Sequence, residues 1–191
     1  MEGEIHVTRK VFLLKNFVEI NFLNFEFFKF SFLLQGRDLV HDRASPVRVL
    51  NYYVKYGDGK DLGLPLGGVG TTLTGVTHFT NRAESHAGYC HGGSMCSLLD
   101  DVIGWVAFLV TGRCIPWSGF TVQVNTNLKR PIKVDSILLV KATITQVVRR
   151  KVSVAATILD PADEEPLVHA SGEGLVILNR GILPEEPTSE S

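Results

Sequence analysis

"GYCHGGSMCSLLDDVIGWVAFLV", residues 88–110, passes from a histidine and two glycines straight into a helical pattern. From Ser94 onwards its apolar residues recur every three or four positions, which is the period of an α-helix with one buried stripe. That stripe consists of Met95, Leu98, Leu99, Val102, Ile103, Val106, Leu109 and Val110. We therefore predict a long buried helix from Ser94 to about Val110, around which the other segments must pack.

Two adjacent aspartates interrupt this apolar segment. At about 100° per residue, Asp100 falls outside the stripe, and Asp101 points about 100° away from it, so only one carboxylate can face a given pocket. Trp105 and Phe108 also lie off the stripe, which predicts that the helix is covered on more than one side. Asp100 shares its side with small residues that allow a second element to approach closely: Gly93, Gly104 and Ala107.

Strand-like segments lie on both sides of the predicted helix. Residues 47–60 form an apolar element that ends in a turn, and residues 71–80 have the threonine and valine content of a strand. Four more candidates follow the helix, at residues 120–128, 136–148, 151–159 and 166–178. Because short connections join consecutive strands in an antiparallel meander, we expect these four to pair in sequence order. The pattern predicts an α+β fold.

Size and composition limit the number of domains, the kind of partner and the cellular compartment that we expect. A chain of 191 residues has room for one domain with extensions, and a formal net charge of -1 offers nucleic acid no electrostatic attraction. The chain holds three cysteines, Cys90, Cys96 and Cys114. Their odd number indicates free thiols in a reducing compartment, either the cytoplasm or an organelle lumen with reducing conditions.

The amino-terminal segment at residues 11–34 carries eight of the eleven phenylalanines. Its four charged residues, Lys15, Glu19, Glu26 and Lys29, would each cost about 2.5–3.5 kcal/mol near a bilayer centre, so we expect no membrane span. The segment also lacks the pattern of a secretory signal or a transit peptide. Alternating phenylalanines predict a strand over residues 25–32. Residues 1–45 form an extension whose structure and role the pattern leaves open.

The segments "HGGSMCSLLDD" and "GFTVQVNTNLKRP" resemble the hotdog-fold acyl-CoA thioesterases of the phenylacetic-acid type, including the thioesterase-superfamily-member branch. The resemblance covers about residues 70–180. It implies a hotdog domain over residues 46–180, in which a curled antiparallel sheet wraps a long central helix. The acidic, proline-containing residues 181–191 predict a disordered tail. The implied function is hydrolysis of acyl-CoA in fatty acid metabolism by a homodimer or homotetramer.

The resemblance also implies the site. Thioester hydrolysis passes through an oxyanion, and the first amides of a helix have no internal partner, so they can bind it. By resemblance, His91 begins the helix, the Gly92 amide polarises the carbonyl, and Asp100 of the partner subunit activates water or attacks directly. Thr121 matches the residue that orients the water, with Ser118 as a competitor. Some relatives carry an asparagine where this chain has Ser85, which leaves the second oxyanion donor open.

Basic residues at two strand ends suit the phosphates of coenzyme A. The expected CoA-binding set is Gly93, Lys129, Arg130, Arg150 and Lys151. For Lys129 and Arg130 the resemblance favours a ligand. For the cluster at residues 149–151, ligand binding and solvated turn charges are both open.

A metal site, a dehydratase and a non-catalytic binding protein are the alternatives to hydrolysis. A zinc site built from His86, Cys90, His91 and Cys96 matches no known ligand spacing, so we expect neither metal nor cofactor. A dehydratase of the same fold requires a different catalytic motif. The remaining alternative is a hotdog dimer that binds acyl-CoA without hydrolysing it. Asp100 favours an enzyme, because a pure binder needs no carboxylate beside a thioester.

Overall fold

The computed structural model describes residues 18–20, 40, 42, 44–161 and 166–184. The predicted strand at residues 25–32 lies outside these residues, as do most of the extension and residues 185–191 of the predicted tail. Among the described residues, none of the helices has the length and apolar character needed to cross a membrane.

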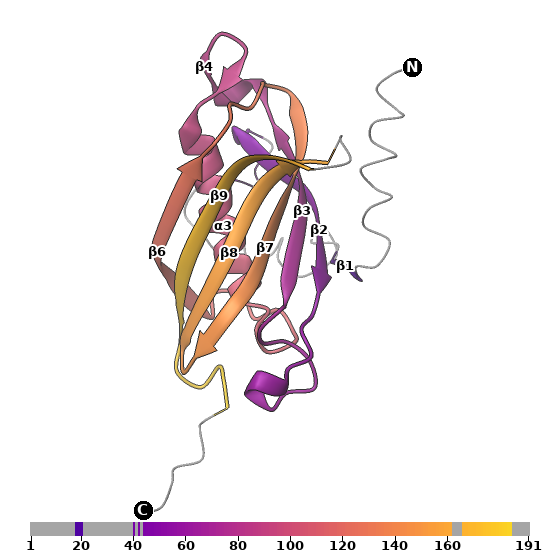
Figure 1. Cartoon of the computed structure of the whole chain (residues 1–191), viewed down its shortest axis with the longest axis vertical. Helices are drawn as coiled ribbons and strands as arrows, with labels where there is room; N and C mark the ends of the chain where they lie inside the picture. The colour runs from indigo at the N-terminus through magenta and orange to yellow at the C-terminus, as the bar shows by residue number, and fades with distance from the viewer. Residues whose placement is uncertain (1–17, 21–39, 41, 43, 162–165, 185–191) are drawn as a thin grey trace, which may run out of the picture.

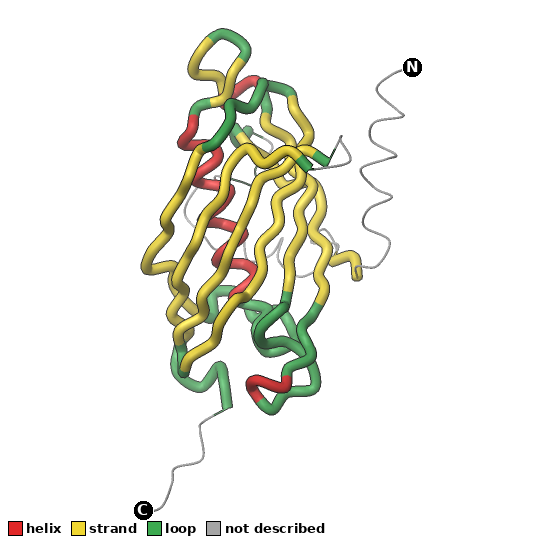
Figure 2. The backbone as a smooth tube through the Cα atoms, viewed as in Figure 1, coloured by secondary structure: helices red, strands yellow, loops and turns green. Residues whose placement is uncertain are grey.

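One long helix lies inside the curve of a seven-stranded antiparallel sheet (Figures 1 and 2). The helix is α3 (Gly92–Ala107), and the strand order in the sheet is β1-β2-β3-β7-β8-β9-β6. The sheet remains open, with β1 and β6 as its edges. The predicted α+β hotdog arrangement is confirmed. The sheet strands are β1 (Val18–Ile20), β2 (Val47–Lys55), β3 (Thr72–Phe79), β6 (Gly119–Leu128), β7 (Ser136–Val148), β8 (Lys151–Asp160) and β9 (Leu167–Leu178).

Short elements complete the fold. A small hairpin of β4 (Glu84–His86) and β5 (Tyr89–Cys90) stands directly before α3, at the upper end of the molecule in Figure 1. Two 3-10 helices, η1 (Lys60–Leu62) and η2 (Asn81–Ala83), lie in the connections around β3. Part of the predicted extension also joins the sheet, because β1 pairs with β2.

The predicted pairing of all four later strands in sequence order is wrong for β6. Strands β7, β8 and β9 form the expected meander, but β6 pairs with β9, and β3 takes the place beside β7. The connection after β6 crosses the end of the sheet instead of turning back. Ile132 anchors this crossing: its side chain is fully buried and its carbonyl oxygen accepts a hydrogen bond from the Cys90 amide (2.9 Å). The crossing leaves β6 at an edge.

The apolar stripe of α3 forms the centre of the core, as predicted. Leu98, Leu99, Val102, Ile103 and Val106 are all fully buried or nearly so. Burying a side chain of this size stabilises a fold by about 1.5–3 kcal/mol. The regular helix ends at Ala107, three residues earlier than predicted, and residues 108–110 continue as buried turns. Trp105 and Phe108 are also buried, which confirms cover on a second side.

Two glycines in β9 set how closely the helix approaches the sheet. A Cβ atom on Gly174 would lie 2.5 Å from Cγ2 of Ile103, whereas the nearest atom to a Cβ on Gly172 would be Cδ1 of Leu99 at 3.5 Å. The first distance is a steric clash and the second is an ordinary contact. Gly174 is therefore required for the packing of α3, while Gly172 has room for a methyl group.

We expect Gly174→Ala to lower the free energy of unfolding by about 1–3 kcal/mol, the usual cost of overpacking a core. Gly172→Ala is the matched control on the same strand and should change stability by less than about 1 kcal/mol, since alanine also restricts the unfolded chain. Denaturant unfolding followed by circular dichroism would measure both. Equal losses would contradict the close approach at Gly174.

Candidate active site

His91 closes the amino end of α3 as its N-cap. Its Nδ1 atom accepts a hydrogen bond from the Gly93 amide (2.8 Å), and its carbonyl oxygen accepts one from the Ser94 amide (3.0 Å). The His91 amide in turn donates to the carbonyl oxygen of Ala83 (2.7 Å). Because Nδ1 is the acceptor, a neutral ring carries its proton on Nε2. His91 therefore caps the first turn of α3 and also ties it to Ala83, which precedes the helix.

The two glycines after His91 have different reasons to be glycine. A Cβ atom on Gly93 would lie 2.9 Å from Nδ1 of His91, so a side chain there would push the capping ring away. On Gly92 it would lie 2.6 Å from Cδ1 of Leu128, the tip of a flexible side chain on β6. Gly93 serves the cap, and Gly92 lets the end of β6 lie against the helix start.

The Gly92 amide is the open donor at this end of the helix. The first amides of an α-helix have no partner within the helix and carry its partial positive charge. Here the Gly93 and Ser94 amides both donate to His91, and the Gly92 amide donates to none of the described residues. The cap therefore leaves one backbone N–H available for a negatively charged or polarised oxygen.

Asp100 lies two helical turns further along and is exposed. It borders an open hollow of about 460 Å³ between α3 and β6. The hollow is lined by Cys96, Ser97, Asp100, Thr121, Val122, Gln123, Val124 and Thr126. The carboxylate of Asp100 thus faces a space that small molecules or a second protein chain can reach.

Asp101 points to the other side of the helix and has a structural partner. Its Oδ2 atom accepts a hydrogen bond from the hydroxyl of Tyr52 (2.9 Å), a buried residue of β2. A carboxylate bonded in this way is oriented toward the sheet. The two adjacent aspartates therefore have different environments: Asp101 is hydrogen-bonded to the sheet, and Asp100 borders the hollow.

The two residues expected to orient the water, Thr121 and Ser118, and Ser85, at the position of the second oxyanion donor, lie near this hollow to different degrees. Thr121 borders it together with Asp100, and its Oγ1 atom faces α3, 3.6 Å from where a Cβ of Gly104 would lie. Ser118 is almost fully buried, and its hydroxyl has no hydrogen-bond partner among the described residues. Ser85 is exposed on β4, at the irregular position of the β4–β5 hairpin. Of the three, Thr121 shares a space with Asp100.

A second hollow, of about 320 Å³, opens beside the helix start. His91, Gly93 and Ser97 border it, and Ser97 also borders the hollow of Asp100.

Within one chain, however, Gly92 and Asp100 are eight residues apart on a helix, which is about 12 Å along its axis. A donor and a carboxylate acting on one carbonyl group must both lie within hydrogen-bonding reach of it. One chain alone does not bring these two groups together.

The predicted CoA-binding cations lie at opposite ends of the sheet (Figure 1). Lys129 and Arg130 follow Leu128, which touches the helix start, and both their amides donate to the carbonyl oxygen of His169 (2.8 and 3.0 Å). Lys151 pairs with Ile177, whereas Leu128 pairs with Ala170, seven residues away on β9. That is about 23 Å along a strand. Within one chain, a ligand held at the helix start is near Lys129 and Arg130 and far from Arg150 and Lys151.

Two of the three cysteines, Cys90 and Cys114, do not supply a nucleophile at neutral pH. Burial raises the pKa of the Cys114 thiol to about 11, and burial also raises the pKa of Cys90, with smaller contributions from Asp135 and Glu84. Both thiols therefore stay protonated, and the thiolate is the reactive form. Across the described part of the chain, no three His, Cys, Asp or Glu side chains are grouped so as to hold a metal ion.

Comparison with known proteins gives one family and a set of similar folds. Residues 87–167 match the family model of the thioesterase superfamily. A solved thioesterase superfamily protein is 29% identical over 56% of this chain and 49% of its own, with a TM-score of 0.47, so the match spans about half of that protein. The resemblance to hotdog thioesterases that the sequence indicates is confirmed.

Two bacterial structures share the fold at lower identity. A hypothetical thioesterase protein of Streptococcus pneumoniae, solved with coenzyme A, is 18% identical over 69% of this chain and 88% of its own, with a TM-score of 0.51. A candidate thioesterase of Lactococcus lactis is 14% identical over 70% of this chain and 92% of its own, with a TM-score of 0.53. Both show the hotdog fold.

We expect His91→Ala to lower the free energy of unfolding by about 0.5–2 kcal/mol, because it removes the N-cap acceptor of the Gly93 amide. His91→Asn, which can cap in the same way, should recover most of that loss. Thermal unfolding of the two variants beside the wild type would measure the difference. If alanine and asparagine were equally destabilising, the ring of His91 would not be acting as the cap.

Proposed function

We propose that this chain, whose residues 87–167 match the thioesterase superfamily, is an acyl-CoA thioesterase that hydrolyses a thioester to a free acid and CoA. The observation that carries the proposal is the open Gly92 amide at the start of α3, left free by the His91 cap. A backbone donor at the positive end of a buried helix is suited to an oxygen that gains negative charge during a reaction.

The first step is polarisation of the thioester carbonyl. Its oxygen accepts a hydrogen bond from the Gly92 amide, and the helix start stabilises the charge that develops on that oxygen. Glycine at this position also keeps a side chain out of the path of the substrate. The second oxyanion donor stays open, because Ser85 is the residue where some relatives carry asparagine.

The second step needs the carboxylate of Asp100 from a partner subunit. In one route, Asp100 takes a proton from water while the water oxygen bonds to the thioester carbon. Collapse of the tetrahedral intermediate then breaks the C–S bond, and the CoA thiolate leaves and takes up a proton. In the other route, Asp100 attacks the carbon directly, the C–S bond breaks, and the CoA thiolate leaves and takes up a proton. Water then hydrolyses the resulting mixed anhydride to the free acid and the Asp100 carboxylate. In the first route, the hydroxyl of Thr121 orients the water, since it borders the same hollow.

The edge strand β6 supports a second copy of the chain as that partner. An edge strand presents unpaired backbone groups that can pair with another chain. On β6, Phe120 and Val122 are 69% and 52% exposed, and Leu128 is 47% exposed, an unusual apolar content for a free edge. Antiparallel pairing of two β6 strands brings the helix start of one subunit toward the hollow of the other. We therefore propose a homodimer, which can pair further into a tetramer.

The CoA portion belongs, in this proposal, beside the helix start. Lys129 and Arg130 follow Leu128, which lies against the helix start, and their charges suit the phosphates of CoA. Gly93 borders the hollow on that side. Arg130 already donates one hydrogen bond to the carbonyl oxygen of Val168 (3.3 Å), which orients its guanidinium. Arg150 and Lys151 can reach the same ligand only from a partner subunit, so their role in CoA binding stays a prediction.

The alternative is a dimer that binds acyl-CoA without hydrolysing it. Ser85 in place of the asparagine favours this alternative, because an incomplete oxyanion hole stabilises the transition state less. A panel of short, medium, long and aromatic acyl-CoAs, read by a thiol reagent, separates the two functions. Release of free CoA supports the enzyme, whereas binding of the same substrates without turnover supports the alternative.

We expect Asp100→Asn to lower kcat by about 10²–10⁴-fold, since it keeps the shape and removes the base or nucleophile. Asp101→Asn is the matched control on the next residue and should stay within a few-fold of wild type, because Asp101 is bonded to Tyr52. Thr121→Ala should fall between them, with a loss of about tenfold at most. Steady-state kinetics on the best substrate of the panel would rank the three. The reverse order for the two aspartates would exclude Asp100 as the catalytic residue.

We expect the shared site to show in subunit mixing. Proline lacks an N–H group and is favoured at the first position of a helix, so Gly92→Pro removes the donor with little strain in α3. Gly92→Ala keeps the N–H group and adds the same Cβ atom beside Leu128, so it is the control for the effect of a side chain alone. Mixing inactive Gly92→Pro with inactive Asp100→Asn under conditions of subunit exchange should restore up to about a quarter of wild-type activity, from the mixed dimers with one complete site. Absence of recovery in dimers shown to have exchanged would contradict a shared site.

A further inference from the structure

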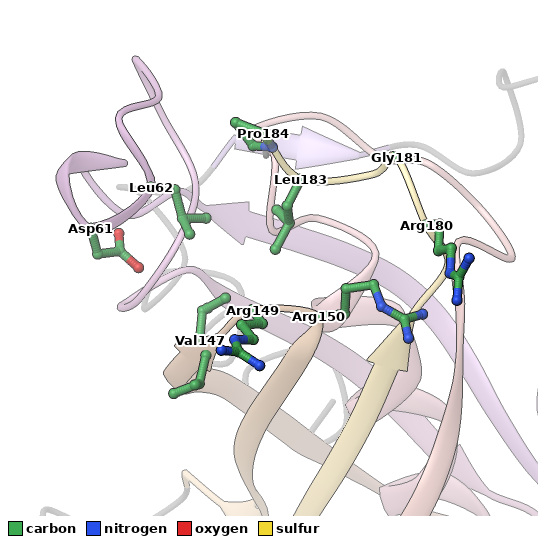
Figure 3. A pocket seen from close by; sticks show the side chains of 10 residues that line it. Asp61, Leu62, Val147, Arg149, Arg150, Arg180, Gly181, Leu183 and Pro184 are labelled. Atoms are coloured by element: carbon green, nitrogen blue, oxygen red, sulfur yellow. The ribbon is translucent and has the colours of Figure 1, made fainter. Parts of the chain in front are cut away.

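A third pocket lies at the other end of the molecule from the helix start, where the β7–β8 hairpin meets the chain that leaves β9 (Figure 3). Its volume is about 680 Å³, within the range of small-molecule sites. It is lined by Asp61, Leu62, Val147, Val148, Arg149, Arg150, Arg180, Gly181, Leu183 and Pro184. Four of these ten, at 147–150, come from the β7–β8 hairpin, four come from the segment after β9, and two come from η1.

Three arginines give the pocket its charge. In Figure 3, Arg149, Arg150 and Arg180 lie along one side of it. The single carboxylate of the lining, Asp61, already accepts a hydrogen bond from the Val69 amide (3.0 Å). None of the three arginines forms a salt bridge with a described residue. Three guanidinium groups beside one carboxylate leave the pocket with an excess of positive charge.

Hydrogen bonds hold the side chain of Arg150 and the backbone just before Arg180. Leu178 and Arg150 are joined twice: the Leu178 amide donates to the carbonyl oxygen of Arg150 (2.8 Å), and Nη1 of Arg150 donates to the carbonyl oxygen of Leu178 (2.9 Å). Arg180 follows Asn179, which makes two hydrogen bonds to the loop before β6, at Ser118 and Trp117 (2.7 and 3.2 Å). The guanidinium of Arg150 keeps further N–H donors for a ligand.

The β7–β8 turn has residues that are unusual for its backbone conformation. Arg149 and Arg150 form a two-residue loop between the paired residues Val148 and Lys151, and Arg149 has a φ of 53°. Glycine and asparagine are the residues that such left-handed turn positions favour. Arginine in this left-handed conformation has a higher backbone energy than glycine or asparagine would have. Backbone strain of this kind is concentrated at functional sites.

The other side of the pocket is aliphatic. In Figure 3, Leu62, Leu183 and Pro184 lie opposite the arginines, whereas Val147, another apolar residue of the lining, lies beside Arg149. The lining holds no aromatic ring that could stack on a nucleotide base. An anion recognised here should therefore carry an aliphatic chain rather than a nucleoside.

We propose that this arginine pocket binds a carboxylic acid with an aliphatic chain of medium length. The carboxylate accepts hydrogen bonds from Arg150 and Arg180, and the chain lies against Leu62 and Leu183. Guanidinium groups match a carboxylate in a bidentate geometry, and the aliphatic wall removes the chain from water. A free acid of this kind is also the product class of the proposed function, but the chemistry of the pocket carries the inference without it.

Direct binding to the full chain tests the pocket independently of hydrolysis. Isothermal titration with decanoate should give saturable binding with one site per chain. Decanol, which has the chain without the charge, and acetate, which has the charge without the chain, should each bind at least about tenfold more weakly. Because the readout is heat of binding, the Asp100→Asn variant should bind decanoate as the wild type does, even if the chain hydrolyses no thioester.

Two variants locate the binding. Arg180→Gln and Leu183→Ser remove one polar and one apolar contact, and each should weaken decanoate binding by about tenfold. Lys141→Gln, on an exposed position of β7, is the control for loss of one positive charge and should leave the affinity unchanged. Thermal unfolding of each variant confirms that it is folded. If Arg180→Gln and Leu183→Ser both bound decanoate with the affinity of the wild type, the assignment to this pocket would be overturned.

Three further outcomes would also overturn the inference. If 3′,5′-ADP binds more tightly than decanoate and displaces it, Arg150 belongs to a CoA site and the pocket is not for an aliphatic acid. If decanoate binds only after Glu185 and Glu186 are replaced by glutamine, the arginines serve the chain's own acidic residues. Absence of saturable decanoate binding in the wild type at millimolar concentration would exclude the site altogether.

Discussion

The hydrogen bond from the Gly93 amide to Nδ1 of His91 is the contact on which the candidate site depends. It sets the residue at which α3 begins, and so it decides which backbone amides are used and which one stays free. It also explains the two flexible residues at the start of a buried helix. Gly93 cannot carry a side chain beside the capping ring, and Gly92 lies against Leu128. A helix that began one residue later would place a different amide at the open position.

The position of β6 has an equally wide effect. Because the chain crosses the end of the sheet after Leu128, β6 runs beside β9, and its other edge pairs with none of the described strands. The same strand provides one wall of the hollow that Asp100 borders, and its end touches the helix start. One strand therefore contacts the start of α3, forms the hollow beside its middle, and presents exposed apolar residues for a second chain.

The local pattern of the sequence predicted the elements well. The helix and the later strands were placed within a few residues, because burial imposes periods of about 3.6 and 2 on the apolar positions. The neighbour of β6 could not be predicted in this way, since the period of a strand carries no information about its partner. The crossing depends on Ile132 and Cys90, which are 42 residues apart in the chain and meet only in the fold.

The site was predictable to a similar degree. The motif of His91, Gly92 and Asp100 is continuous in sequence, so spacing and resemblance were enough to select it. The separate role of Asp101 depends on Tyr52, far earlier in the chain, and no local pattern indicates that contact. The arginine pocket likewise joins three segments, η1, the β7–β8 turn and the residues after β9, that are distant in sequence. The sequence indicates the basic turn at residues 149–151 but not the apolar wall opposite it.

The bond between Tyr52 and Asp101 has a consequence for how the gene of such a protein can change. It fixes the rotation of α3 about its own axis, while the His91 cap fixes its starting point. Substitutions between these two points can accumulate one at a time. Deletion of a single codon between Ser94 and Leu99 would turn everything after it by about 100° relative to the cap. Asp101 would then stand nine residues after His91, and Tyr52 would face an apolar side chain. The length of this segment is therefore a geometric constraint on the site that does not depend on the identity of each residue within it.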